Sequence, residues 1–233
     1  MTYIKTFAII NRLTEKMFIR KRMSMKRELG IRWFFFFFGL AILGLGVALT
    51  IKGQRFGVGS WDVLHIGLFK QLGLTIGLWS IIMGIIIITI SSIGLREFPK
   101  IGTFANMISI GIFIDFFNWL IPNPNTFIVQ FIAFILGVCL IAVGSGIYIS
   151  ANLGAGPRDS LMLLIVSKFR FSITVARTIM EVSVAIAGYL LGGPLGIGTV
   201  FMSFALGPII QVTMKYTGKL LEKSLGRRQV VQH

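Results

Sequence analysis

Six long apolar runs dominate the order of hydrophobic and polar positions along the chain. Each of these runs approaches the roughly 20 residues that a membrane-spanning helix needs. Two further apolar segments, 60–72 and 157–169, are shorter. Such a segment rises about 20 Å as a helix, against a hydrocarbon core of about 30 Å, so we expect broken or re-entrant helices there. The pattern predicts an all-α integral membrane protein whose six spanning helices cover 33–51, 74–95, 101–121, 126–150, 174–191 and 197–214.

The two halves of the chain carry matching motifs. Residues 57–62, GVGSWD, match residues 154–159, GAGPRD, and the sequence IGT occurs at both 101–103 and 197–199. The shift is 97 residues for the first pair and 96 residues for the second. Because the matches extend over a whole half, they indicate an internal duplication. We expect a basic N-terminal arm, two homologous membrane repeats and a basic tail, with the boundaries 1–32, 33–121, 126–217 and 218–233.

Composition supports the membrane class and excludes soluble enzymes and DNA-binding domains. Hydrophobic residues make up 55% of the chain and charged residues 13%, whereas a soluble domain carries about 25% charged residues. The mean hydropathy is +0.85. The net charge is +15, and most of the basic residues lie outside the apolar runs, mainly at the two ends of the chain. We therefore expect these ends to set the topology and to bind anionic lipids of the bilayer, and we expect no nucleic acid partner.

The placement of lysine and arginine predicts the orientation in the membrane. With six spans, the arm, the loop at 96–100, the region around Arg158 and the tail all face the cytoplasm. Each half then contributes three spans, so the two halves have opposite orientations, as in many transporters with discontinuous helices. If both short segments cross, eight spans and parallel repeats result, and the bias of basic residues towards the cytoplasm is weaker.

An aspartate stands in the first turn of each short segment. Asp62 and Asp159 occupy matching positions, and Pro157 suits the first position of a helix. In one interpretation the aspartates only satisfy free backbone N–H groups and complement the helix dipole. In the other, these helix starts lie at membrane depth and form a polar site, to which Ser60 and Arg158 also belong. The two interpretations are compatible, because a capped helix start can line a cavity.

Three more ionisable residues are candidates for this site. His65 follows Asp62 by three residues, so the two side chains share a helix face and could relay a proton, or His65 could simply be a hydrogen-bonded residue near the interface. Arg177 and Glu181 are four residues apart on a spanning helix and could form an ion pair. Such a pair could be structural, or it could bind a substrate or a coupled ion.

The chain lacks the patterns of a catalytic, cofactor or metal site. It holds one cysteine, Cys139, and two histidines, which excludes an intrachain disulfide and a metal site built from several cysteines or histidines. No phosphate-binding loop, dinucleotide fingerprint, HExxH motif or Ser-His-Asp order is present. We therefore expect no enzyme, no cofactor and no metal.

Four segments of the chain resemble a known family. They are GVGSWDVLHIGL, IGTFANMISIGIFIDF, GAGPRDSLMLL and GGPLGIGT, and they are similar to the YczE/YyaS/AitT family of bacterial membrane proteins over about residues 33–217. The first motif departs from the family pattern at Ser60, where a proline is usual. The resemblance implies a multi-pass protein of the bacterial plasma membrane and supplies no substrate or catalytic residue.

These observations favour a permease for a small solute, with its site between the two repeats. The candidate substrate or coupling residues are Ser60, Asp62, His65, Arg158, Asp159, Arg177 and Glu181. The alternative is a membrane scaffold or regulatory protein that transports nothing and acts on a partner through its basic termini. A polar cavity between the repeats would favour the permease, and a solidly packed interface would favour the scaffold. In both cases we expect the N- and C-termini in the cytoplasm.

Overall fold

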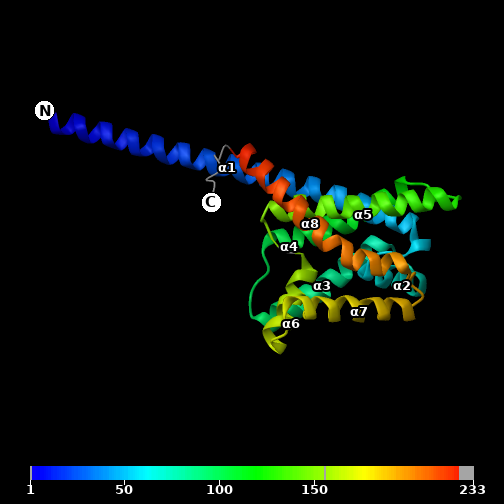
Figure 1. Ribbon diagram of the computed structural model, residues 1–233. Coiled ribbons are helices and arrows are strands. Elements are labelled where there is room, and N and C mark those ends of the chain that lie inside the picture. Colours follow the sequence, from blue (N-terminus) through cyan, green and yellow to red (C-terminus); the bar gives the residue numbers. More distant parts are fainter. Residues whose placement is uncertain (1, 155, 226–233) are drawn as a thin grey trace.

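The computed structural model describes the backbone of residues 2–154 and 156–225 and the side chains of residues 25–154 and 156–225. This part of the chain forms α-helices and one short 3-10 turn, η1, and contains no strand (Figure 1). In chain order the elements are α1 (Thr2–Lys52), η1 (Gln54–Phe56), α2 (Ser60–Leu72), α3 (Ile76–Leu95), α4 (Ile101–Leu120), α5 (Phe127–Ser150), α6 (Pro157–Phe169), α7 (Ile173–Leu190) and α8 (Ile197–Ser224).

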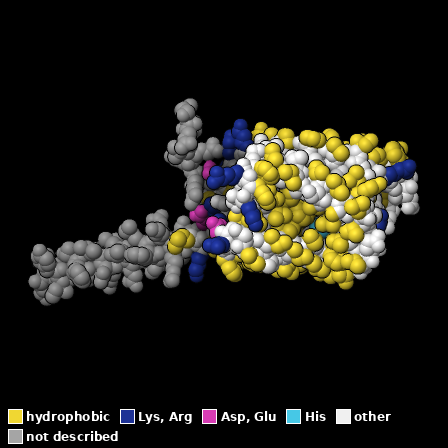
Figure 2. All heavy atoms as spheres, turned by 90° about the horizontal axis from the view of Figure 1, so that it is seen from below, with side chains coloured by type: hydrophobic (Ala, Val, Ile, Leu, Met, Phe, Trp, Pro, Cys, Tyr) yellow, Lys and Arg dark blue, Asp and Glu magenta, His cyan; other side chains and the backbone are white. Residues whose placement is uncertain are grey.

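The predicted all-α membrane fold is confirmed. Six helices are long and apolar enough to cross a bilayer: α3, α4, α5, α7, α8 and the part of α1 from Met25 to Lys52. The other two, α2 and α6, have 13 residues each and begin at the predicted positions. Figure 2 shows hydrophobic side chains over the body of the molecule, with lysine and arginine at its two ends, as a lipid-facing surface requires.

Both basic ends are helical where the structure describes them. The predicted arm, 1–32, is helical from Thr2 and joins the first span in one continuous helix, and α8 continues to Ser224, so the predicted tail, 218–233, begins inside a helix. The physical reason is composition, because lysine, arginine, glutamate, methionine and leucine are strong helix formers. Residues 226–233 of the tail lie outside the described residues.

The centre of the bundle is a close contact between α1 and α5, the first helix of each half. Gly46 of α1 lies against Gly137 of α5, and Gly39 of α1 lies against Gly144 of α5. A Cβ atom built on Gly46 would lie 2.6 Å from the backbone nitrogen of Ile141. Only glycine allows this approach, and small residues serve the same purpose at many helix contacts in membranes.

Two pairs of helices exchange partners between the halves: α2 packs on α7, and α6 packs on α3. By contrast, α4 packs on α1 and α8 packs on α5, each within its own half. The end of the bundle from which α1 projects is called the arm end, and the opposite end, with Lys52, is called the far end. Figure 1 shows α6 towards the arm end and α2 towards the far end. The two short helices therefore enter the bundle from opposite ends.

The loops before the short helices rest on the other half of the chain. The Val58 N–H donates a hydrogen bond to Thr199 Oγ1 at the start of α8, with an N···O distance of 3.3 Å. In the other half, a Cβ atom on Gly154 would lie 2.8 Å from the Thr103 nitrogen at the start of α4. Gly57 also needs glycine for its backbone, because its φ of +114° is unfavourable for other residues. The duplicated glycine motifs thus hold the starts of α2 and α6 in place.

Candidate functional site

The start of α2 buries a row of polar side chains. The backbone before it is extended, and every residue from Ser60 to Gly67 is buried. The Asp62 carboxylate folds back over the loop, since a Cβ atom on Gly59 would lie 2.8 Å from Asp62 Oδ2. This position complements the positive end of the helix dipole, as the sequence predicts. The other carboxylate oxygen, Oδ1, accepts no hydrogen bond.

Four polar atoms in this row are buried without a hydrogen-bond partner. They are Trp61 Nε1, Asp62 Oδ1 and both ring nitrogens of His65. The three residues are 2%, 3% and 1% exposed. Asp62 Oδ1 and His65 Nδ1 lie 3.7 Å apart, which is too long for a hydrogen bond. Native structures leave few buried polar groups unsatisfied, and each costs about 1–3 kcal/mol. The start of α2 therefore presents buried donors and acceptors that no described residue satisfies with a hydrogen bond.

Arg158, at the start of α6, reaches this cluster from the other half. Its guanidinium carbon lies 5.1 Å from the centre of the Trp61 ring, in a cation–π contact. Trp61 and Arg158 occupy matching positions of the duplicated motif, so the starts of the two short helices meet here. The N-terminal end of a helix carries a partial positive charge. Two such ends and a guanidinium together suit a polar or anionic group.

Asp159 caps the start of α6. The Gly156 N–H donates a hydrogen bond to Asp159 Oδ2, with an N···O distance of 3.3 Å, so the structural interpretation of this aspartate is correct. Arg158 and Arg177 both lie close enough to Asp159 to interact with it electrostatically. Arg158 interacts in the same way with His65. Arg158 is therefore the residue that connects the two duplicated motifs.

Two residues beside this cap were not predicted from the sequence. Asn106 of α4 and Tyr148 of α5 converge on Gly156: a Cβ atom there would lie 3.6 Å from Asn106 Oδ1 and 3.8 Å from the Tyr148 hydroxyl oxygen. Each is a polar residue within a predicted spanning helix, and this was the signal that could have found them. No group of three or more potential metal-ligating side chains occurs among the described residues.

The predicted Arg177–Glu181 ion pair is wrong. Among the described residues, the ion pairs shorter than 4.0 Å are Arg32–Glu28 and the Asp62–His65 contact. Arg177 is exposed and interacts with Asp159 on α6 instead. The structure thus brings Asp62, His65 and Arg158 together next to Ser60 and places Asp159 and Arg177 beside them. Glu181 forms no ion pair with a described residue.

Comparison with known proteins places the chain in a bacterial family. The uncharacterized membrane protein YczE of Bacillus subtilis (strain 168) is 46% identical over 204 residues, which cover 88% of this chain and 95% of YczE. An uncharacterized protein of Haemophilus influenzae (strain ATCC 51907 / DSM 11121 / KW20 / Rd) is 34% identical over 187 residues, covering 78% of this chain and 83% of its own length. YyaS of Bacillus subtilis (strain 168), also uncharacterized, is 29% identical over 187 residues, covering 79% of this chain and 92% of its own length. No solved structure matches the chain. The family of unknown function DUF6198 matches residues 30–215, and the chain therefore belongs to this family, as the resemblance to YczE and YyaS predicts.

Proposed function

We propose that this protein is a permease for a small polar solute in the bacterial plasma membrane, rather than an enzyme or a scaffold. The solute binds where the starts of α2 and α6 meet. The observation that carries the proposal is the row of four buried polar atoms without a hydrogen bond, on Trp61, Asp62 and His65, beside Arg158. A scaffold gains nothing from such a row, because each unsatisfied group costs about 1–3 kcal/mol. A transport site gains an empty set of hydrogen-bonding groups for its substrate.

The reciprocal packing of the two halves supports an inverted repeat. Helix α2 packs on α7 as α6 packs on α3, and this exchange also holds for single residues. Leu191 contacts Gly67, and Leu164 contacts Gly94; these are matching pairs at the shift of 97 residues. Three spans in each half reverse the chain between them, so the halves are related by an axis in the membrane plane. Many secondary transporters bind substrate between such repeats.

The basic residues orient this arrangement in the membrane. The arm end carries the loop at 96–100 and the last turns of α8, which are rich in lysine. By the positive-inside rule the arm end faces the cytoplasm, with both termini, and its lysines bind anionic lipid. The far end faces outwards.

The site residues divide into three roles in this proposal. Arg158 and the two helix starts bind the solute through hydrogen bonds and positive charge. Asp62 and His65, which lie 3.7 Å apart, carry the proton or ion that is coupled to transport. Asp159 holds the start of α6 through its bond from the Gly156 N–H and orients Arg158.

Metabolite profiling of a deletion strain tests the proposal. Comparing the metabolites inside and outside the cells identifies solutes whose distribution changes, and uptake or efflux in proteoliposomes then tests each one. Wild-type protein restores the distribution, whereas Asp62→Asn and Arg158→Gln, expressed at equal levels, do not. Lys168→Gln, which removes a charge at the end of α6, is the matched control and restores it. Full restoration by Arg158→Gln would contradict the proposed site, and an unchanged metabolite distribution in the deletion strain would favour the scaffold.

A further inference from the structure

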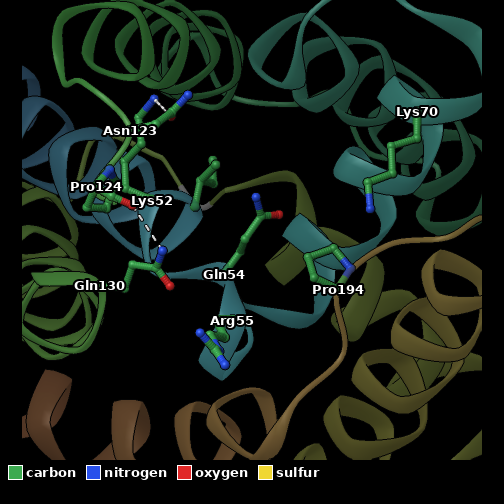
Figure 3. A pocket seen from close by; sticks show the side chains of 9 residues that line it. Lys52, Gln54, Arg55, Lys70, Asn123, Pro124, Gln130 and Pro194 are labelled. Atoms are coloured by element: carbon green, nitrogen blue, oxygen red, sulfur yellow. Dashed lines mark hydrogen bonds between the residues drawn. The ribbon is translucent and has the colours of Figure 1, made fainter. Parts of the chain in front are cut away.

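A second polar region lies at the far end, away from the site between the halves. It is a pocket of about 440 Å³ that opens at the surface (Figure 3). The residues around it come from the end of α1, from η1, from the end of α2, from the start of α5 and from the loops after α4 and α7. Its polar lining residues are Lys52, Gln54, Arg55, Lys70, Asn123 and Gln130.

The charge of this pocket is positive and uncompensated. Lys52, Arg55 and Lys70 line it, and the segments 52–59, 69–75, 121–127 and 191–196 contain no aspartate or glutamate. None of the three cations forms an ion pair with any described carboxylate. The nearby Asp115 is committed elsewhere, because it accepts hydrogen bonds from the Thr75 hydroxyl and the Gly77 N–H at the start of α3.

Neutral groups hold the cations in place without reducing their charge. Lys52 Nζ donates to Asn123 Oδ1 at 2.7 Å, and Lys70 Nζ donates to the Gly192 carbonyl oxygen at 2.8 Å. The Arg55 guanidinium carbon lies 5.3 Å from the centre of the Phe127 ring. Each cation keeps free N–H donors, since an ammonium has three and a guanidinium has five. The donors are therefore positioned before any ligand arrives.

We propose that this pocket is a binding site for a small oxyanion, such as a phosphate, a sulfate or the phosphate group of a larger molecule. Three positioned cations and three side-chain amides match an anion with several acceptor oxygens. The pocket also has a defined relation to the site between the halves, because Lys70 and Trp61 lie on the same helix, about 14 Å apart along its axis. The proposal concerns binding at the far end and does not depend on transport.

Two sources could supply this chemistry, a free anion or the headgroup of an anionic lipid. The two sources are distinguished by titrating inorganic phosphate into the protein in nanodiscs of phosphatidylcholine. A parallel titration uses nanodiscs that also contain phosphatidylglycerol. Calorimetry measures the affinity. Saturable binding in both nanodiscs indicates a free anion, and binding that the anionic lipid abolishes indicates a headgroup. Either result supports an oxyanion site.

Variants decide whether the pocket is the site. The triple variant Lys52→Gln, Arg55→Gln and Lys70→Gln lowers the affinity for phosphate by at least about tenfold, as expected from lost charge-assisted hydrogen bonds. The matched control removes three lysines from the arm end, with Lys100→Gln, Lys168→Gln and Lys219→Gln, and binds phosphate as the wild type does. Equal affinity in both triple variants, or no phosphate binding by the wild-type protein in phosphatidylcholine, would overturn the proposal. Monodisperse gel filtration of the triple variant excludes misfolding as the cause of a loss.

Discussion

The close contact between α1 and α5 predicts how much stability the protein loses when Gly46 is replaced by alanine. In Gly46→Ala the new Cβ atom would lie 2.6 Å from the Ile141 backbone nitrogen and 2.8 Å from the Gly137 carbonyl oxygen. Both of these are backbone atoms, which cannot rotate away as a side chain can. A normal contact is about 3.5 Å, so the two helices must separate locally by about 1 Å.

This separation has a calculable cost. Inserting a methyl group into a packed contact costs about 1–3 kcal/mol, and replacing glycine by alanine within a helix returns up to about 1 kcal/mol. Both clashing atoms belong to the backbone, so the cost lies in the upper part of this range, and we expect the free energy of unfolding to fall by about 1–2 kcal/mol. The matched control is Gly218→Ala in α8, because a Cβ atom there meets nothing within 4 Å. Gly218→Ala should leave the stability unchanged or raise it by less than about 1 kcal/mol.

Unfolding with SDS in mixed micelles measures both variants. Tryptophan fluorescence follows the transition, since Trp61 is buried beside the contact between the halves. The expected order of stability is Gly218→Ala at or above the wild type, with Gly46→Ala clearly below it. Equal stability of Gly46→Ala and the wild type would refute the close approach of α1 and α5.

Three further predictions concern the site and the topology. Asp159→Asn keeps an acceptor for the cap, so the protein should fold in normal yield. It removes the charge that orients Arg158, so transport should be lost; normal transport would leave Asp159 only a structural role. A double-mutant cycle of Trp61→Leu and Arg158→Gln, measured by the same SDS unfolding, should give a coupling energy of about 0.5–2 kcal/mol, and a value of zero would mean that the cation–π contact is absent. In a protein without Cys139, single cysteines at Glu97 and Asn123 should react with impermeant thiol reagents from the cytoplasmic and the outer side respectively; the reverse result, which eight spans predict, would contradict the inverted repeat.

The sequence predicted those features of the fold that depend on local pattern. The length of each apolar run determined which helices can span a bilayer, and α2 and α6 began at the predicted residues because Gly-x-Gly loops precede them. The meeting of these two helix starts was inferred from the duplicated motif. The contact between Trp61 and Arg158 brings them together in the structure.

The features that the sequence did not predict depend on packing between distant segments. Asn106 and Tyr148 belong to helices that converge only in the folded bundle. The Arg177–Glu181 pair does not form, because a spacing of four residues permits an ion pair but does not require one. Arg177 instead interacts electrostatically with Asp159 on another helix. The pocket at the far end likewise needs the turn after α1 to bring separate cations together.

Water access to the junction of α2 and α6 tests the central claim most directly. The chain with Cys139→Ala carries Ser60→Cys or Arg158→Cys, and Ile114→Cys, which is 1% exposed in the apolar core, is the control. Membrane vesicles are treated with a charged, water-soluble methanethiosulfonate reagent, and mass spectrometry measures the fraction labelled. A solute site between the halves predicts labelling at positions 60 and 158 and none at position 114. If positions 60 and 158 stay as unreactive as position 114, the junction is a dry, packed interface and the permease is ruled out.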